Sequence, residues 1–85
     1  MTPNGLEAVF LLNRDKLLQF LRSLARADDA EDLLQELWLR ATTVEAGPVA
    51  KPLSYLYRIA HNLALERYRQ TVRAQRRDQD WNESV

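Results

Sequence analysis

The sequence lacks cysteine altogether and has a single histidine, His61, among its 85 residues. Without cysteine the chain can form neither a disulfide framework nor a thiolate metal site, and one histidine cannot build a metal centre alone. This composition excludes catalysis by a cysteine–histidine pair or by a protein-held metal. We therefore expect no cofactor, and an enzyme is the least favoured class of function.

Glycine and proline are also scarce, with two and three residues respectively, too few for a turn-rich β-sandwich. The abundant residues are instead good helix formers, chiefly Leu, Ala, Arg, Glu and Gln. A chain of this length makes one small domain. We expect an all-α fold built around a single compact core.

No long apolar run occurs in the sequence, and its first ten residues carry no basic side chain. A membrane span needs about 18 consecutive apolar residues, and a signal peptide needs a basic start. We expect no membrane insertion and a cytoplasmic location.

The chain has no net charge, but its charges are unevenly distributed. Residues 1–50 contain five basic and eight acidic side chains, whereas residues 51–77 contain seven basic side chains and one acidic, Glu66. The C-terminal half is therefore the candidate surface for a polyanion.

Apolar residues recur at helical spacing in three segments, which predicts a compact three-helix bundle. The first helix is expected over 6–25, the second from a cap at Asp28 or Asp29 to about Thr43, and the third from Pro52 towards Arg77. Residues 42–52 are expected to form a loop. The helical domain would then span 1–77, and 78–85 would be a flexible tail or the start of a linker to an absent C-terminal domain.

Each helix is expected to bury one stripe. The predicted core residues are Leu6, Val9, Phe10, Leu17, Phe20, Leu21, Leu24, Ala30, Leu33, Leu34, Leu37, Trp38, Ala41, Leu53, Leu56, Ile59, Ala60, Leu63 and Ala64, with Tyr57 and Tyr68 flanking the last stripe.

The opposite face of the second helix carries Asp32, Gln35, Glu36 and Leu39. One interpretation is a solvated face with a stray leucine, which is common on protein surfaces. The other is a docking strip, in which leucine burial gives affinity and the carboxylates orient a partner helix bearing Lys or Arg.

The face of the third helix opposite its buried apolar stripe combines cationic, amide and aromatic side chains. That face comprises Ser54, Tyr55, Arg58, His61, Asn62, Leu65 and Arg69. Arginines attract phosphates, an amide matches a base edge, and a tyrosine ring can stack on an unpaired base. Single-stranded nucleic acid would suit this set, although a polar outer face with incidental arginines is the plainer interpretation, and His61 reads as an ordinary surface residue.

Arg67 falls on the buried side of the third helix. An unpaired guanidinium would be costly there, so we expect Arg67 to pair with a carboxylate or with backbone carbonyls of the bundle.

Two motifs in order, 29–40 (DAEDLLQELWLR) and 56–69 (LYRIAHNLALERYR), resemble region two of extracytoplasmic-function sigma factors of the sigma-70 family. The likeness covers roughly residues 6–77. The entry to the third helix, Pro52–Leu56, looks closest to the iron-uptake subgroup.

The resemblance implies a bundle of the sigma region 2 type that binds core RNA polymerase and both recognises and melts the minus-ten promoter element. The polymerase-binding residues, which would contact the β′ clamp helices, are Asp32, Gln35, Glu36, Leu39 and Arg40. The DNA-binding residues, which would hold the single-stranded non-template strand, are Tyr55, Arg58, His61, Asn62, Leu65 and Arg69. An anti-sigma factor is a further candidate partner.

The sequence departs from the family at Tyr55, where many relatives have tryptophan, and in the loop 42–52, which lacks their aromatic and glycine-rich signature. Base preference does not follow from the resemblance at these positions. The alternatives are a helical protein-interaction module that never touches DNA and a fragment of a helix-turn-helix repressor.

Overall fold

The computed structural model describes residues 5–43 and 50–83, with side chains as far as Gln79. These residues form four helices, α1 (Gly5–Leu12), α2 (Arg14–Leu24), α3 (Ala27–Thr43) and α4 (Pro52–Glu83), and the described ranges contain no strand. The all-α prediction is confirmed, but there are four helices rather than three. Of the predicted loop 42–52, residues 44–49 lie outside the described residues.

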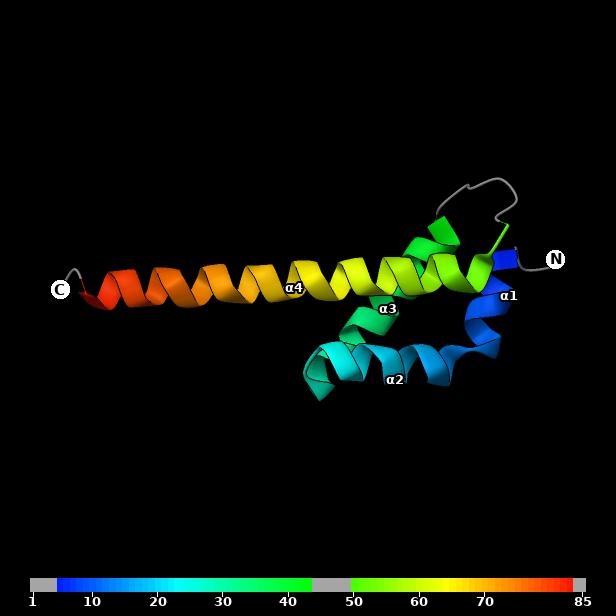
Figure 1. Ribbon diagram of the computed structural model, residues 1–85, viewed down its shortest axis with the longest axis horizontal. Coiled ribbons are helices and arrows are strands. Elements are labelled where there is room, and N and C mark those ends of the chain that lie inside the picture. Colours follow the sequence, from blue (N-terminus) through cyan, green and yellow to red (C-terminus); the bar gives the residue numbers. More distant parts are fainter. Residues whose placement is uncertain (1–4, 44–49, 84–85) are drawn as a thin grey trace.

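The first predicted helix is divided at Asn13. The backbone N–H of Asn13 donates to the carbonyls of both Val9 and Phe10 at 3.1 Å, and its side-chain Nδ2 donates to Val9 O at 2.9 Å. Asparagine side chains compete with the helix for backbone groups in this way. The chain therefore turns at Asn13, and α1 and α2 approach α3 and α4 from different directions (Figure 1).

The second predicted helix begins two or three residues earlier than a cap at Asp28 or Asp29 would give. Ala30 N–H donates to Arg26 O at 2.9 Å, so the hydrogen-bond ladder of α3 starts at Arg26. Asp28 and Asp29 consequently lie in the first turn of α3 and are not its cap. Carboxylates in a first turn still interact favourably with the positive end of the helix dipole.

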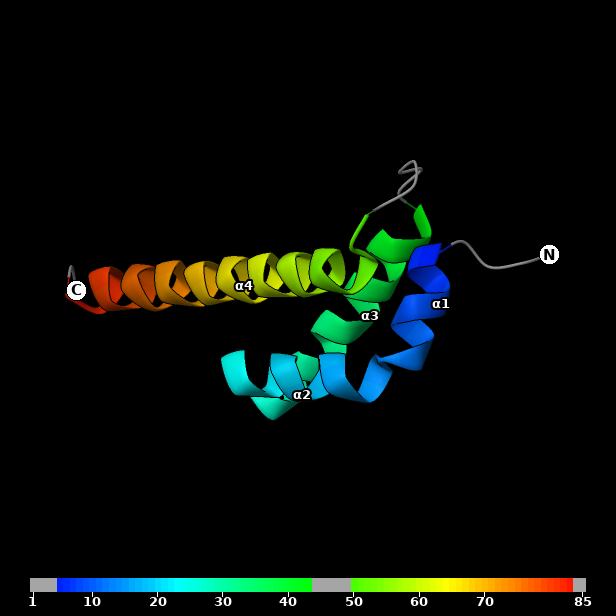
Figure 2. The ribbon, with the colours of Figure 1, turned by 45° about the vertical axis from the view of Figure 1, so that its right-hand side comes forward.

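The fourth helix begins at Pro52, as predicted, and continues beyond Arg77 to Glu83. With 32 residues it is about 48 Å long at 1.5 Å per residue. Both views show α4 extending well past the end of α2 and the start of α3 (Figures 1 and 2). Whether 78–85 begin a linker to another domain stays a prediction.

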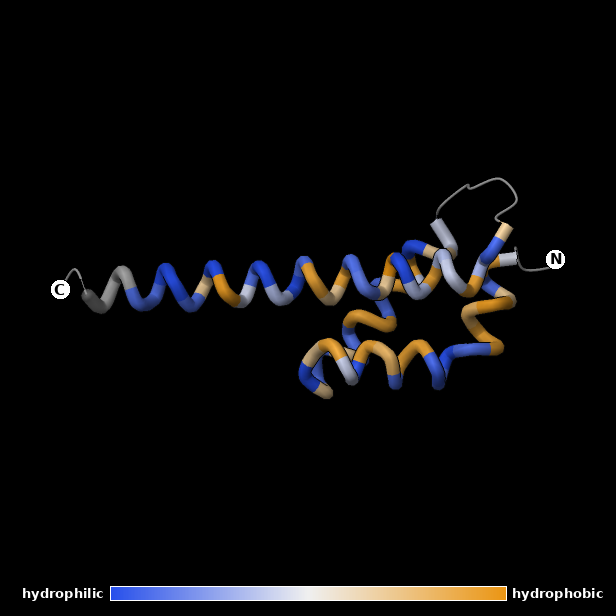
Figure 3. The backbone as a smooth tube through the Cα atoms, viewed as in Figure 1, coloured by the Kyte–Doolittle hydropathy of each residue, from blue (hydrophilic) through white to orange (hydrophobic). Residues whose placement is uncertain are grey.

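The core lies where α1, α2, α3 and the first half of α4 meet. It consists of Leu6, Phe10, Leu17, Leu21, Ala30, Leu33, Leu34, Leu37, Ala41, Leu56, Ala60, Leu63 and Ala64. Burying a leucine side chain contributes about 1.5–3 kcal/mol. Figure 3 shows hydrophobic segments gathered in this region, while the projecting part of α4 is mostly hydrophilic.

Two ring contacts close the edges of the core. Phe10 and Trp38 lie 5.1 Å apart between centroids, and Phe20 meets Tyr57 edge-on at 4.9 Å. Such tilted arrangements suit the quadrupoles of aromatic rings. They tie α1 to α3 and α2 to α4.

Within the described ranges, no helix combines the length and the apolarity that crossing a bilayer requires.

Candidate functional site

The outer side of α3 presents the residues predicted for partner binding, and we call Asp32, Gln35, Glu36, Leu39 and Arg40 the acidic strip. Leu39 is 58% exposed, and Asp32, Gln35 and Arg40 are also exposed. Glu36 is half-buried because it leans towards α4. The helical projection therefore placed this strip correctly on the surface, with Leu39 as a solvent-facing apolar side chain.

Arg67 of α4 reaches across to α3 and contacts three carboxylates. Its Nη2 lies 2.9 Å from Oδ2 of Asp32 and 3.9 Å from Oε2 of Glu36, and its Nη1 lies 3.4 Å from Oδ1 of Asp29. The prediction that Arg67 pairs with carboxylates of the bundle is confirmed. The hydrogen bond that Arg67 donates to Asp32 is the largest cause that raises the pKa of Arg67; burial opposes this rise, and the charges of Asp32, Asp29 and Glu36 each add a smaller increase.

The contacts of Arg67 change how the acidic strip presents its charge. Asp32 and Glu36 are partly compensated from within the molecule, since both face a cation on α4. The side chain of Asp32 nevertheless remains 62% exposed, so a partner can still reach it. Sequence spacing predicted that Arg67 needs a partner, but not that the partners would be members of the strip.

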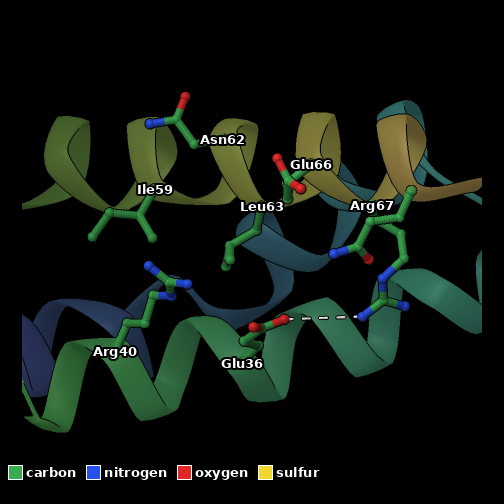
Figure 4. A pocket seen from close by; sticks show the side chains of 8 residues that line it. Glu36, Arg40, Ile59, Asn62, Leu63, Glu66 and Arg67 are labelled. Atoms are coloured by element: carbon green, nitrogen blue, oxygen red, sulfur yellow. Dashed lines mark ion pairs between the residues drawn. The ribbon is translucent and has the colours of Figure 1, made fainter. Parts of the chain in front are cut away.

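A groove of about 430 Å³ separates α3 from α4 beside Arg67 (Figure 4). Its lining residues are Glu36, Arg40, Ile59, Asn62, Leu63, Glu66, Arg67 and Gln70. In Figure 4, Arg40 and Ile59 point into the space between the helices, whereas Asn62 points away from α3. The groove thus brings one edge of the acidic strip close to the residues predicted for DNA binding.

The outer side of α4 carries the predicted DNA-binding residues, with one exception, and we call Arg58, His61, Asn62, Leu65 and Arg69 the cationic face. All five are exposed, Leu65 at 38%. Neither Arg58 nor Arg69 forms an ion pair within the described part of the chain. The face therefore carries uncompensated positive charge.

Tyr55 is the exception. The sequence projection turned it outward, but its side chain is half-buried and packs against the hydrophobic core. It lies in the first turn of α4, where its N–H donates to Lys51 O at 3.0 Å. The projection placed Tyr55 beyond the edge of the buried stripe, but a large ring at that position can still reach the core.

Two residues that were predicted in or beside the core lie instead on the surface. Tyr68, expected to flank the buried stripe of the third predicted helix, is 65% exposed, and Leu24, expected in the buried stripe of the first, is 43% exposed. The cause is the end of α2: at Ala25 the backbone becomes extended, so no helix from the bundle covers α4 beyond this level. Periodicity gives the phase of a helix but not where its neighbour stops.

Further arginines continue along α4 beyond the bundle. Arg73, Arg76 and Arg77 are exposed and, like the cationic face, form no ion pair among the described residues. No group of three His, Asp or Glu side chains in those residues is arranged to hold a metal ion. The described surfaces offer a partner charge and apolar area.

These features define an all-helical domain with an acidic, leucine-bearing surface on one helix and an arginine-bearing surface on the next. The model of the sigma-70 region 2 family matches residues 9–74, which is most of the chain, and the protein belongs to this family. The domain is therefore a sigma-factor domain, with a role in transcription initiation. Neither the curated proteins nor the solved structures yielded a match.

Proposed function

We propose that this chain binds core RNA polymerase through the acidic strip and recognises and melts the minus-ten promoter element through the cationic face. The observation that carries the proposal is that both surfaces are exposed on a member of the sigma-70 region 2 family, and that neither surface contributes a residue to the buried core. We assign the chain to the extracytoplasmic-function type because of its two motifs. We assign it to the iron-uptake subgroup because of the residues Pro52–Leu56. The protein would work in the cytoplasm, where an anti-sigma factor is a candidate regulator.

For polymerase binding, Leu39 would enter a pocket on the β′ clamp helices while Asp32 and Glu36 attract the partner's basic side chains. Apolar burial supplies affinity, and charge fixes the orientation of the two helices. Gln35 and Arg40 border Leu39 along the same side of α3 and would complete the contact.

For promoter opening, the cationic face would bind the extruded non-template strand more strongly than the duplex. No hydrolysis is needed, because preferential binding of one state shifts the equilibrium towards it. Unstacking a base costs a few kcal/mol, which contacts to phosphates and bases offset. Arg58 and Arg69 suit phosphates, and Asn62 suits a base edge.

The test is the affinity of the purified domain for a single-stranded non-template minus-ten oligonucleotide and for its duplex, measured over a salt series. We expect the single strand to bind more tightly at every salt concentration. Equal affinity for the two would contradict promoter melting by this domain.

A further inference from the structure

A shallow apolar hollow lies where α2 ends against α4. Its volume is about 190 Å³, and it is lined by Leu24, His61, Ala64, Leu65 and Tyr68. Ala64 is almost fully buried and forms its floor, while Tyr68 is 65% exposed at its edge. The hollow therefore offers two aromatic rings and aliphatic side chains to solvent.

The end of α2 creates this hollow. Leu24 is the last residue of α2, and the extended backbone at Ala25 leads the chain away into α3. The fourth helix continues past the end of α2 (Figure 2), and Tyr68 is largely exposed there. A small residue at position 64 leaves room beside Leu65 that a larger side chain would fill.

Two arginines lie within about one helical turn of the hollow's lining residues, because Arg58 precedes His61 by three residues and Arg69 follows Leu65 by four. Arg58 and Arg69 lie on the same exposed side of α4 and have no carboxylate partner among the described residues. The nearby acidic residue of α4, Glu66, lines the groove on the side of α3 instead. An occupant that places a flat apolar ring in the hollow and negative charge at its rim matches this arrangement.

We propose that Tyr68 is the ring on which an unpaired base of single-stranded DNA stacks, with Leu24 and Leu65 supporting the base and Arg58 and Arg69 holding the flanking phosphates. This inference rests on the proposed function and assigns the stacking role to Tyr68. Aromatic side chains bind unpaired bases through their faces, so an exposed ring is required. Tyr55 is half-buried against the core and offers less of its ring.

The experiment compares Tyr68→Ala, Tyr68→Phe and the unchanged chain in binding a fluorescein-labelled single strand of about 12 nucleotides, within the usual site size. Tyr68→Ala should weaken binding between about fivefold and a hundredfold, the loss typical of one stacked base. Tyr68→Phe keeps the ring and should bind within about twofold of the unchanged chain. Because Tyr68 is uncharged, the salt dependence of binding should not change.

A second arm separates stacking from a structural effect. An abasic site is moved along the oligonucleotide, and at one position it should abolish the difference between Tyr68→Ala and the unchanged chain, because the base that stacks is then missing. Thermal unfolding of Tyr68→Ala should match that of the unchanged chain, since the ring is mostly exposed.

The outcomes distinguish the two proposals. Unchanged affinity in Tyr68→Ala, or a loss that no abasic position removes, overturns the stacking role while leaving strand binding intact; the hollow would then suit an apolar side chain of a protein partner. If the unchanged chain shows no preference for single strands, both the proposed function and the stacking role are wrong.

Discussion

The acidic strip of α3 and the cationic face of α4 lie on neighbouring helices but carry their charges differently. The strip's two carboxylates both contact Arg67, and Arg40 adds a positive charge to the strip itself. The two arginines of the cationic face have no such partner in the described chain. A compensated surface must obtain affinity from apolar burial, whereas an uncompensated one obtains it from charge.

The two surfaces should respond differently to salt. Contacts that neutralise phosphates release counterions and weaken steeply with ionic strength. Contacts centred on a buried leucine depend far less on screening, because the hydrophobic effect is not electrostatic. Polymerase binding should therefore persist at salt concentrations that already disrupt DNA binding.

The largest expected effect concerns the apolar centre of the strip. Leu39→Asp should weaken capture of a β′ clamp-helix fragment by more than about a hundredfold, since it replaces a leucine that the partner would bury in the complex with a charge. A titration with the purified fragment measures the loss, and circular dichroism should show unchanged helicity. Leu12→Asp is the matched control, because Leu12 is 84% exposed at the end of α1, outside the strip. Capture retained by Leu39→Asp would place the polymerase interface elsewhere.

The next effect concerns the ion pairs between Arg67 and the three carboxylates of α3. Arg67→Met should lower the free energy of unfolding by about 1–2 kcal/mol, between the values for exposed and buried pairs, because three carboxylates lose their common partner. Urea denaturation measures the change, and Arg67→Lys should recover part of it. Arg14→Met should change stability by less than about 0.5 kcal/mol, because Arg14 and Asp15 form an exposed pair at 4.0 Å.

The pH dependence of this effect follows from the raised pKa of Arg67. A group whose pKa is raised by folding stabilises the fold below its unfolded pKa and loses that contribution only as the pH passes its folded pKa. For an arginine both values are strongly alkaline. The difference between Arg67→Met and the unchanged chain should therefore stay constant from neutral to mildly alkaline pH; a decline over that range would count against the guanidinium as its source.

The smallest effect tests the uncompensated surface. Arg58→Ala and Arg69→Ala should each reduce the slope of log affinity against log salt by about one unit, the amount expected for one lost phosphate contact. Arg22→Ala is the control, because Arg22 lies on α2, 3.9 Å from Glu31. An unchanged slope in either α4 variant would remove that arginine from phosphate binding.

The sequence predicted the helical fold and the phase of each helix well, since apolar spacing determines which side of a helix is buried. The phase of α3 predicted the exposed strip, and the phase of α4 predicted that Arg67 needs a partner. The division at Asn13 was missed because Phe10 and Leu17 are seven residues apart, a spacing that one unbroken helix would also give. The residue type at Asn13, and not the apolar periodicity, was the feature of the sequence that could have predicted the break between α1 and α2.

The errors at the site have a related cause. The exposure of Tyr68 was missed because the projection treats a helix as if its neighbours had the same length, and the half-burial of Tyr55 was missed because the projection takes no account of the reach of a large ring. Only the tertiary arrangement shows that α2 covers one end of α4 and stops at Leu24. The exposed ring in the candidate site could therefore not be identified from the sequence.

The first half of α4 packs in the bundle and the second half projects from it, so the two halves should differ in local stability. A helix without tertiary contacts is marginal in water, because most helical stability in proteins comes from packing. The amides between Leu56 and Ala64 can exchange with solvent only when the bundle itself opens, while those beyond Val72 need only local fraying. One continuous helix therefore contains two units of cooperativity, and a partner that binds the projecting arginines would slow hydrogen exchange there without changing it in the core.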